Sequence, residues 1–382
     1  MLAQPPPDDL IAQIRQRPEV YVGTRGSEGL HELIYEALVY SLKEALVKRC
    51  TRLDITLNYD YQIIVSDNSS GIDTRLIAAL GISFLELKLT RRSTDRHQGM
   101  EAHPLYGLGL PVINALSQVF TAEVRRDGFL WRQEYCYGEK QTPVMRVRSL
   151  LPNESTGLTL RFKPDFEIFE QHELDYAALA LRLRMIAFLV PDLEVTLKDE
   201  RIGLRDHFHY LNGLRELTRF LNRGQVLLHD PIYGIEEIET LMIDSWSYTV
   251  RVEIAFQYIL SGAGTQRIFV NTLRATANPE AQRGLRAGLL WVLNRYARKQ
   301  GLLREADAEL NVNEISVGLT AVISIYHLYT STGNQKLARM LQQNTWDAAL
   351  RATINAVTLL ERQRPQELRR IVEHVLQRRR DH

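Results

Sequence analysis

Three short segments, far apart in the chain, carry residue types that could do chemistry together. Residues 29–36 form a helix-like run that ends on Glu36, and residues 65–72 lead from an apolar strand into an Asp-x-x-x-Gly turn. Residues 105–117 contain a Gly-x-Gly turn that opens a second helix-like run. A helix carboxylate can serve as a base, and backbone N–H groups at a glycine turn can cradle phosphate. Together with an aspartate that reads an amine, these are the parts that an ATP site requires.

The elements that must position these segments follow from the hydrophobic pattern. Residues 29–49 place apolar side chains at helical spacing, and residues 52–58 and 61–67 alternate as the two strands of a hairpin. Strands and helices then follow in runs without regular alternation, which favours an α+β fold over a doubly wound parallel sheet. Further strands are expected at 119–125, 129–136, 143–149 and 157–163, and a helix is expected at 172–189.

A second unit is expected to begin near Arg223-Gly224, after a helical segment at 211–221. The chain would then divide into residues 1–222 and residues 223–382. Within the second unit, strands are expected at 248–260, 266–270 and 317–326, and helices at 279–301, 336–356 and 365–380.

The composition is that of an ordinary globular protein. A length of 382 residues predicts two or three domains, with 45% hydrophobic and 24% charged residues. The net charge of +1 gives no overall attraction to nucleic acid, so any contact with DNA requires a local patch. Cys50 and Cys136 form neither a metal-binding spacing nor a disulfide framework, and no run of about 18 apolar residues occurs. We therefore expect a cytoplasmic protein that does not enter a membrane.

The order and spacing of the three segments resemble the ATPase region of DNA gyrase B and its type IIA topoisomerase relatives. The resemblance runs from about Arg15 to about Arg380, nearly the whole chain. It implies an α+β fold in which a GHKL (Bergerat-type) ATPase α/β sandwich is followed by a transducer domain like domain 2 of ribosomal protein S5. Further stretches that carry the resemblance are residues 17–23, 156–162, 206–210 and 318–324.

The resemblance also implies roles for individual residues. Glu36 stands where the family's glutamate polarises the water that attacks the γ-phosphate, and Asp67 stands where an aspartate accepts a hydrogen bond from adenine. Gly71 stands where the backbone approaches the base, while Gly107 and Gly109 stand where the family wraps the phosphates. Two alternatives remain open from the residues alone. Glu36 could be a solvated helix residue, and Asp67 could form an Asx turn at the end of a strand.

The metal site implied by the resemblance is altered in this sequence. The family holds Mg²⁺ with an asparagine four residues after its glutamate, and this chain has Tyr40 there. Aspartates that flank that asparagine are replaced by Val39 and Lys43, and a histidine before the glutamate is replaced by Glu32. A phenol is a poor ligand for a hard cation, and a neighbouring carboxylate raises the pKa of Glu36. ATP binding is therefore expected to be possible and Mg²⁺ binding doubtful.

The phosphate loop and the adenine turn also depart from the family pattern. His103-Pro104 replaces a glycine pair before the loop, and proline removes a donor N–H. The turn at residues 68–71 lacks the family's first glycine and its arginine, and Leu158 replaces a threonine that supports the aspartate. In the family, a lysine of the second domain reaches the γ-phosphate. Lys336 lies two positions after the place expected for that lysine, so it can take over this role only if its loop shifts.

Two functional hypotheses follow. In the first, hydrolysis is weak or lost and the chain is a pseudoenzyme that binds nucleotide as a sensor, a partner platform or a DNA-associated clamp. In the second, Glu36 still drives slow, Mg²⁺-dependent ATP hydrolysis alongside a DNA topoisomerase or another DNA-associated partner. A toprim domain and a catalytic tyrosine domain are expected to be missing, so that the chain does not cut DNA by itself.

The partners expected are DNA or a DNA-associated protein, and a homodimer is possible although the N-terminal arm is shorter than in the family. Residues 361–382 form a basic helical segment that could meet DNA phosphates or an acidic partner, or be a solvated face. Its arginines are Arg362, Arg364, Arg369, Arg370, Arg378, Arg379 and Arg380.

Overall fold

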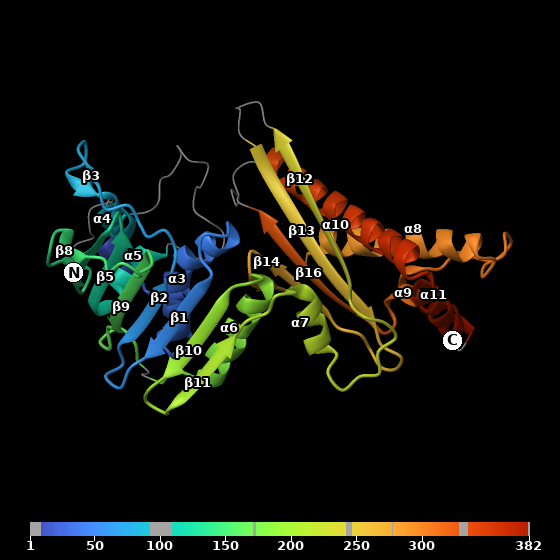
Figure 1. Ribbon diagram of the computed structural model, residues 1–382, viewed down its shortest axis with the longest axis horizontal. Coiled ribbons are helices and arrows are strands. Elements are labelled where there is room, and N and C mark those ends of the chain that lie inside the picture. The colour runs from blue at the N-terminus through green and yellow to red at the C-terminus, as the bar shows by residue number, and fades with distance from the viewer. Residues whose placement is uncertain are drawn as a thin grey trace. The chain divides into compact units, whose positions relative to one another are not determined.

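The computed structural model describes residues 9–91, 109–170, 173–241, 247–276, 278–327 and 335–380. The chain forms two compact units, residues 1–211 and residues 212–382 (Figure 1). The division comes earlier than residue 222 because helix α7 (Leu214–Leu221) packs on the sheet of the second unit. At the end of α7, Asn222 donates to Gln257 and accepts from Thr320, both of which lie on strands of that sheet.

The first unit is built on a nine-stranded sheet in the order β11-β10-β1-β2-β9-β5-β6-β7, with β8 also paired to β6. The β1–β10 pair is parallel and the remaining pairs are antiparallel. The strands are β1 (Arg52–Leu57), β2 (Ile63–Asp67), β5 (Ser117–Arg126), β6 (Phe129–Cys136), β7 (Glu139–Lys140), β8 (Met145–Ser149), β9 (Gly157–Pro164), β10 (Glu194–Asp199) and β11 (Leu204–Phe208).

Helices α3 and α5 pack against this sheet, and the long helix α3 contacts strands β2 and β9 (Figure 1). Helix α3 carries buried apolar side chains along the face turned to the core. The helices are α1 (Leu10–Gln16), α2 (Glu19–Val22), α3 (Ser27–Leu46), α4 (Phe84–Thr90), α5 (Leu110–Ala115) and α6 (Tyr176–Leu189), and a small hairpin joins β3 (Leu76–Ile77) to β4 (Ile82–Ser83).

The expected hairpin of residues 52–58 and 61–67 is confirmed as β1 and β2, whose register pairs Leu53 with Asp67. In each strand the side chains alternate between buried and less buried positions, which is the pattern of a sheet covered on one face. Asp67 is the last residue of β2, so the hairpin places it at the end of that strand, beside the turn that follows. The mixed α+β architecture expected from the sequence is also confirmed.

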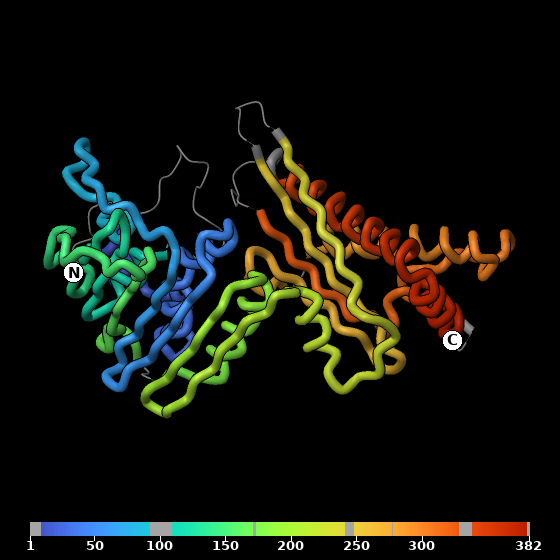
Figure 2. The backbone as a smooth tube through the Cα atoms, viewed as in Figure 1, coloured from blue at the N-terminus to red at the C-terminus, as the bar shows by residue number. Residues whose placement is uncertain are grey.

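The second unit has a five-stranded sheet in the order β12-β13-β16-β14-β15, with β14 and β16 parallel. Helices α8 and α10 pack together and cover one face of this sheet (Figure 2). The strands are β12 (Ile232–Leu241), β13 (Ser247–Tyr258), β14 (Gln266–Val270), β15 (Leu273–Ala275) and β16 (Leu319–His327), and the helices besides α7 are α8 (Pro279–Lys299), α9 (Val312–Ser316), α10 (Gln335–Gln363) and α11 (Pro365–Arg380).

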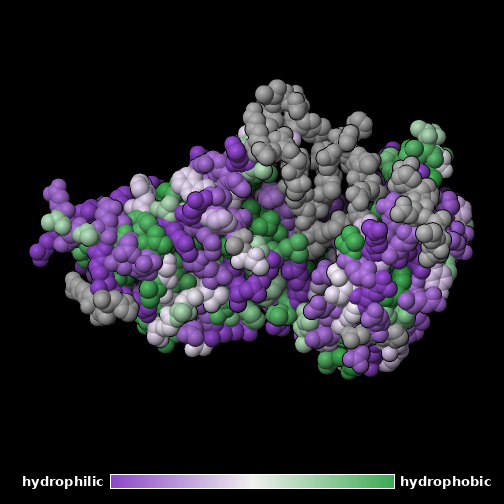
Figure 3. Space-filling view, turned by 180° about the vertical axis from the view of Figure 1, so that it is seen from behind, coloured by the Kyte–Doolittle hydropathy of each residue, from purple (hydrophilic) through white to green (hydrophobic). Residues whose placement is uncertain are grey.

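The strands and helices expected in the second unit are confirmed, whereas β12, the short strand β15 and the short helix α9 were not expected. The face seen in Figure 3 is mostly polar, with apolar side chains in small scattered groups.

Within the described ranges, we find no helix whose length and apolar character would let it cross a membrane.

Candidate functional site

Glu36 lies on α3 and is buried, with 4% of its surface exposed. The alternative that it is a solvated helix residue is therefore wrong. One of its carboxylate oxygens, Oε2, accepts a hydrogen bond of 2.5 Å from the backbone N–H of Gly109. Gly109 has a φ of 68° and caps the start of α5. The structure thus joins two residues that are 73 positions apart in the sequence, the candidate base and the second glycine of the Gly-x-Gly turn.

Burial raises the pKa of Glu36 to about 7. The N–H of Gly109 acts in the opposite direction and lowers this pKa, because it stabilises the charged carboxylate. The neighbouring carboxylate of Glu32 raises the pKa, as the sequence predicts, although it contributes less than burial, and the ammonium group of Lys43 lowers it. A base with a pKa close to neutral pH is well placed to take a proton and to release it again.

Asp67 is almost fully buried at the end of β2 and accepts three hydrogen bonds. Its Oδ2 accepts from the hydroxyl of Ser41 at 2.6 Å, and its Oδ1 accepts from the N–H groups of Ser69 at 3.0 Å and Leu158 at 2.8 Å. The bond from Ser69 closes the Asx turn that was the alternative expectation. A carboxylate has about four acceptor positions, so Oδ2 retains room for one more donor. Forming the turn is therefore compatible with reading an amine.

Gly71 closes the turn with a φ of 71°, in the region that favours glycine. A Cβ atom at this position would lie 3.0 Å from the side chain of Val124. The carbonyl oxygen of Gly71 accepts from the hydroxyl of Tyr40 at 2.9 Å and from a guanidinium nitrogen of Arg126 at 3.0 Å. The backbone of the turn is therefore held close to both α3 and β5.

The side chains at the position where the resemblance places the metal do not suit Mg²⁺ as ligands. Tyr40 uses its hydroxyl on Gly71, burial raises the pKa of that phenol, and Val39 is a buried hydrocarbon. In the described parts of the chain, no group of three or more acidic, histidine or cysteine side chains is arranged to hold a metal ion. Mg²⁺ prefers oxygen ligands, and neither the phenol of Tyr40 nor the hydrocarbon of Val39 offers one that suits it.

Two expected site residues cannot be placed. Gly107 lies outside the described residues, and Lys336 lies on α10 but its side chain lies outside the description. Their roles stay predictions.

The sequence reasoning did not identify the side chains that hold the turn. Ser70 stands where the family pattern has arginine, and its hydroxyl donates to Glu44 at 2.6 Å. Glu44 also accepts two hydrogen bonds from Arg49. The signal that could have found Glu44 is helical spacing, because Glu36, Tyr40 and Glu44 follow one another at intervals of four residues on one face of α3.

Comparisons with known sequences identify relatives of this chain. A family model described as DNA gyrase B matches residues 213–382. DNA gyrase B of Haloferax volcanii is 35% identical over 323 residues, which cover 83% of this chain and 49% of the relative. The chain is homologous to the ATPase region of gyrase B. The gyrase B proteins of Thermotoga maritima and Archaeoglobus fulgidus are also 35% identical, each over 83% of this chain, and the matches cover 50% and 49% of these relatives.

Solved structures show the same fold. The 43K ATPase domain of Thermus thermophilus gyrase B, in complex with an aminocoumarin, superposes with a TM-score of 0.80 and 26% identity, covering 96% of this chain and 94% of that one. The ATP-binding domain of Francisella tularensis topoisomerase IV has a TM-score of 0.75 and 22% identity, covering 96% and 95%. The expected combination of a GHKL domain and a transducer domain is thereby confirmed. The chain spans about half the length of the gyrase B relatives that it matches.

The raised pKa of Glu36 has a consequence for stability. The pKa is about 7 in the folded protein against 4.5 for a free side chain, so the folded state binds more protons between these values. The free energy of unfolding should therefore fall as pH rises from about 4.5 to about 7, by at most about 3 kcal/mol. Glu36→Gln, which carries no charge, should be more stable than wild type at pH 8 and equally stable at pH 4.5, as measured by urea unfolding.

Glu28→Gln is the control, because Glu28 lies on the same helix and is exposed. It should follow the wild-type pH dependence. Equal pH dependence in wild type and Glu36→Gln would show that Glu36 titrates as an ordinary carboxyl.

Proposed function

We propose that this chain binds ATP and hydrolyses it slowly, with Glu36 as the base that accepts a proton from the attacking water. The observation that carries the proposal is the hydrogen bond between Glu36 and Gly109, which holds a buried carboxylate at the turn where the family wraps phosphate. The matched structures are described as an ATPase domain and an ATP-binding domain, and we extend ATP binding from them to this chain.

The base of the nucleotide is proposed to lie at the turn that follows β2. Asp67 keeps one acceptor position on Oδ2, and this oxygen would accept from the exocyclic amine of adenine. Gly71 supplies a backbone without a side chain next to the base. Gly109, Gly107 and Lys336 are proposed to contact the phosphates.

Hydrolysis is proposed to be slow because the chain lacks suitable metal ligands at Tyr40. A metal that neutralises the phosphates is a large part of ordinary phosphoryl transfer. Here Lys43 and Arg126 are cations close to the site, since Lys43 lowers the pKa of Glu36 and Arg126 donates to Gly71. Fixed cations give charge compensation, although they do not supply the Lewis-acid chemistry that a metal would supply.

A second candidate is nucleotide binding without turnover. The hydrogen bond from Tyr40 to Gly71 favours it, because it removes the Tyr40 hydroxyl from any role toward a cation. In either case we propose that the chain works with a DNA topoisomerase or another DNA-associated partner, and that it forms a homodimer. Contact with DNA would fall to Arg362 and Arg370, which are exposed and, in the described part of the chain, make no ion pair. Arg379, by contrast, is paired with Glu314.

Replacing the base separates chemistry from binding. Glu36→Gln keeps an oxygen that can accept from Gly109 and cannot take a proton, so hydrolysis in a single turnover should fall about 10²-fold or more. Affinity for ATP, measured by isothermal titration calorimetry, should change less than about twofold because no binding contact is lost. Glu28→Gln is the control and should hydrolyse ATP at the wild-type rate. Wild-type turnover in Glu36→Gln would assign the activity to another group or to a contaminant.

The metal dependence tests the altered metal site. Wild-type affinity for ATP should change little when Mg²⁺ is removed by a chelator, and any turnover should stay below about 1 per second. Tyr40→Asn combined with Lys43→Asp returns oxygen ligands and removes a cation, so this variant should bind ATP more tightly with Mg²⁺ than without it. Wild-type hydrolysis at about 1 per second or faster that stops on chelation would contradict the altered metal site.

A further inference from the structure

A buried polar junction in the first unit has no role in the candidate nucleotide site described above. It lies where α4 and α5 pack together and where α4 contacts strand β6. Three side-chain atoms there are buried and, among the residues that the structure describes, have no hydrogen-bond partner: Oδ1 of Asn114, Oε1 of Gln133 and the hydroxyl of Tyr135. Buried polar atoms in folded proteins are nearly always paired, so these three atoms require an explanation.

Helix α4 brings the three side chains together. Its Glu86 accepts from Nε2 of Gln133 at 3.2 Å, and the carbonyl oxygen of Leu89, three residues further on, accepts from Nδ2 of Asn114 at 3.1 Å. Gln133 and Tyr135 are two positions apart on β6, so their side chains lie on the same face of the sheet. Burial raises the pKa of Tyr135, and the nearby carboxylate of Glu86 raises it further.

The neighbours of the two amides determine which atom of each amide is unpaired. Gln133 directs its NH₂ group at two acceptors, the carboxylate of Glu86 and, at 3.4 Å, the carbonyl oxygen of Thr142. Asn114 also directs its NH₂ group at a carbonyl oxygen. The amide oxygens therefore remain as acceptors, and the protonated hydroxyl of Tyr135 remains as a donor. A single hydroxyl proton cannot satisfy two acceptors.

A water molecule matches this set of groups. It can donate one proton to each amide oxygen and accept the proton of the hydroxyl, and about three hydrogen bonds are typical of a buried water. A cation matches the set less well. The carboxylate of Glu86 is already paired with the ammonium group of Lys140 at 2.8 Å, and the hydroxyl of Tyr135 would have to turn its proton away from the ion.

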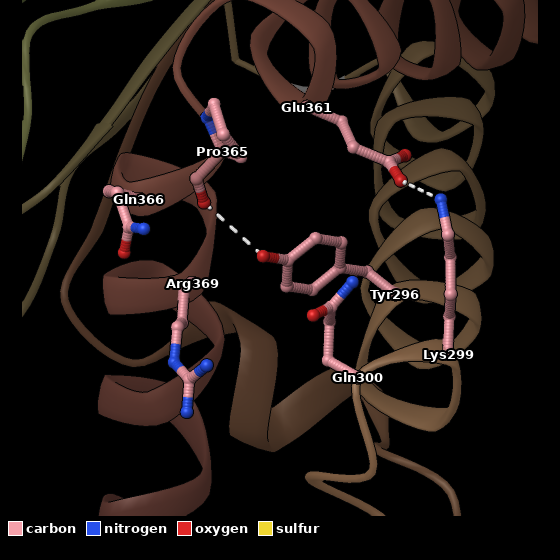
Figure 4. A pocket seen from close by; sticks show the side chains of 7 residues that line it. All are labelled: Tyr296, Lys299, Gln300, Glu361, Pro365, Gln366 and Arg369. Atoms are coloured by element: carbon pink, nitrogen blue, oxygen red, sulfur yellow. Dashed lines mark hydrogen bonds and ion pairs between the residues drawn. The ribbon is translucent and has the colours of Figure 1, made fainter.

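Two other buried tyrosines show a different arrangement, in which the hydroxyl reaches a backbone carbonyl directly. Tyr258 donates to the carbonyl oxygen of Ile315 at 2.8 Å. Tyr296 donates to the carbonyl oxygen of Pro365 at 3.2 Å, beside a polar cavity between α8 and the α10–α11 junction (Figure 4). In the described part of the first unit, Tyr135 finds no such carbonyl.

We propose that the junction of α4, α5 and β6 binds one ordered water molecule, held by the amide oxygens of Asn114 and Gln133 and by the hydroxyl of Tyr135. This water joins α5 to β6. It thereby helps to hold the helix whose first turn follows Gly109, the residue that contacts Glu36. The proposal does not depend on whether the chain binds or hydrolyses ATP.

The first test removes the donor. Tyr135→Phe keeps the ring and deletes the hydroxyl, so the water loses one hydrogen bond and the unfolding equilibrium constant, measured in urea on the full chain, should rise roughly two- to tenfold. A junction without water predicts the opposite, because the substitution then removes an unpaired buried hydroxyl. Equal or greater stability in Tyr135→Phe would overturn the proposal. Tyr258→Phe is the matched control, and it should also lose stability because its hydroxyl is bonded directly to the protein.

The second test locates the water. A crystal structure of the full chain, at a resolution that shows ordered solvent, should contain a water within about 2.7–3.2 Å of all three atoms. The same water should be present in Tyr258→Phe, which leaves the junction unchanged. A wild-type crystal structure in which the hydroxyl of Tyr135 binds a protein atom, or in which no water lies at the junction, would overturn the proposal.

Discussion

The hydrogen bond between Glu36 and the N–H of Gly109 is the interaction on which the candidate site depends. A buried carboxylate is costly when it is charged, and a single backbone donor offsets only part of that cost. The pKa of Glu36 is therefore about 7, so near neutral pH this carboxyl group exchanges between its charged and its protonated form. The same bond fixes the start of α5 against α3, so the geometry of the glycine turn and the protonation of Glu36 are coupled.

Helix α3 extends this arrangement along its length. Tyr40 and Glu44 follow Glu36 on one face of the helix and hold the turn after β2 through Gly71 and Ser70. Where the family resemblance implies a base and a metal ligand, this helix carries the buried carboxylate of Glu36 and two supports for the turn. The hydroxyl of Tyr40 is thus used in a structural hydrogen bond that holds the turn after β2.

Much of this arrangement could be predicted from sequence, and the rest depended on contacts between distant residues. Helical periodicity predicted α3, alternation predicted β1 and β2, and the glycine turn predicted the start of α5. The donors to Asp67 could not be predicted in the same way, because Leu158 reaches it only through the pairing of β2 with β9, across 91 residues. The role of Tyr40 was missed since the family pattern marks it only as a missing metal ligand. The strands β10, β11 and β12 were missed. β11 and β12 lie at the ends of their sheets, where polar or charged residues weaken the apolar alternation, and β10 is a short strand inside its sheet with a carboxylate at each end.

The central claim is that Glu36, with its raised pKa, is the base of an ATP-hydrolysing site. The most direct test is the rate of a single turnover of ATP between pH 5.5 and 9. The rate should rise about tenfold per pH unit at low pH and level off above about pH 7, because only the deprotonated carboxylate accepts the proton of water. A measurable rate that does not change with pH across this range would contradict the account.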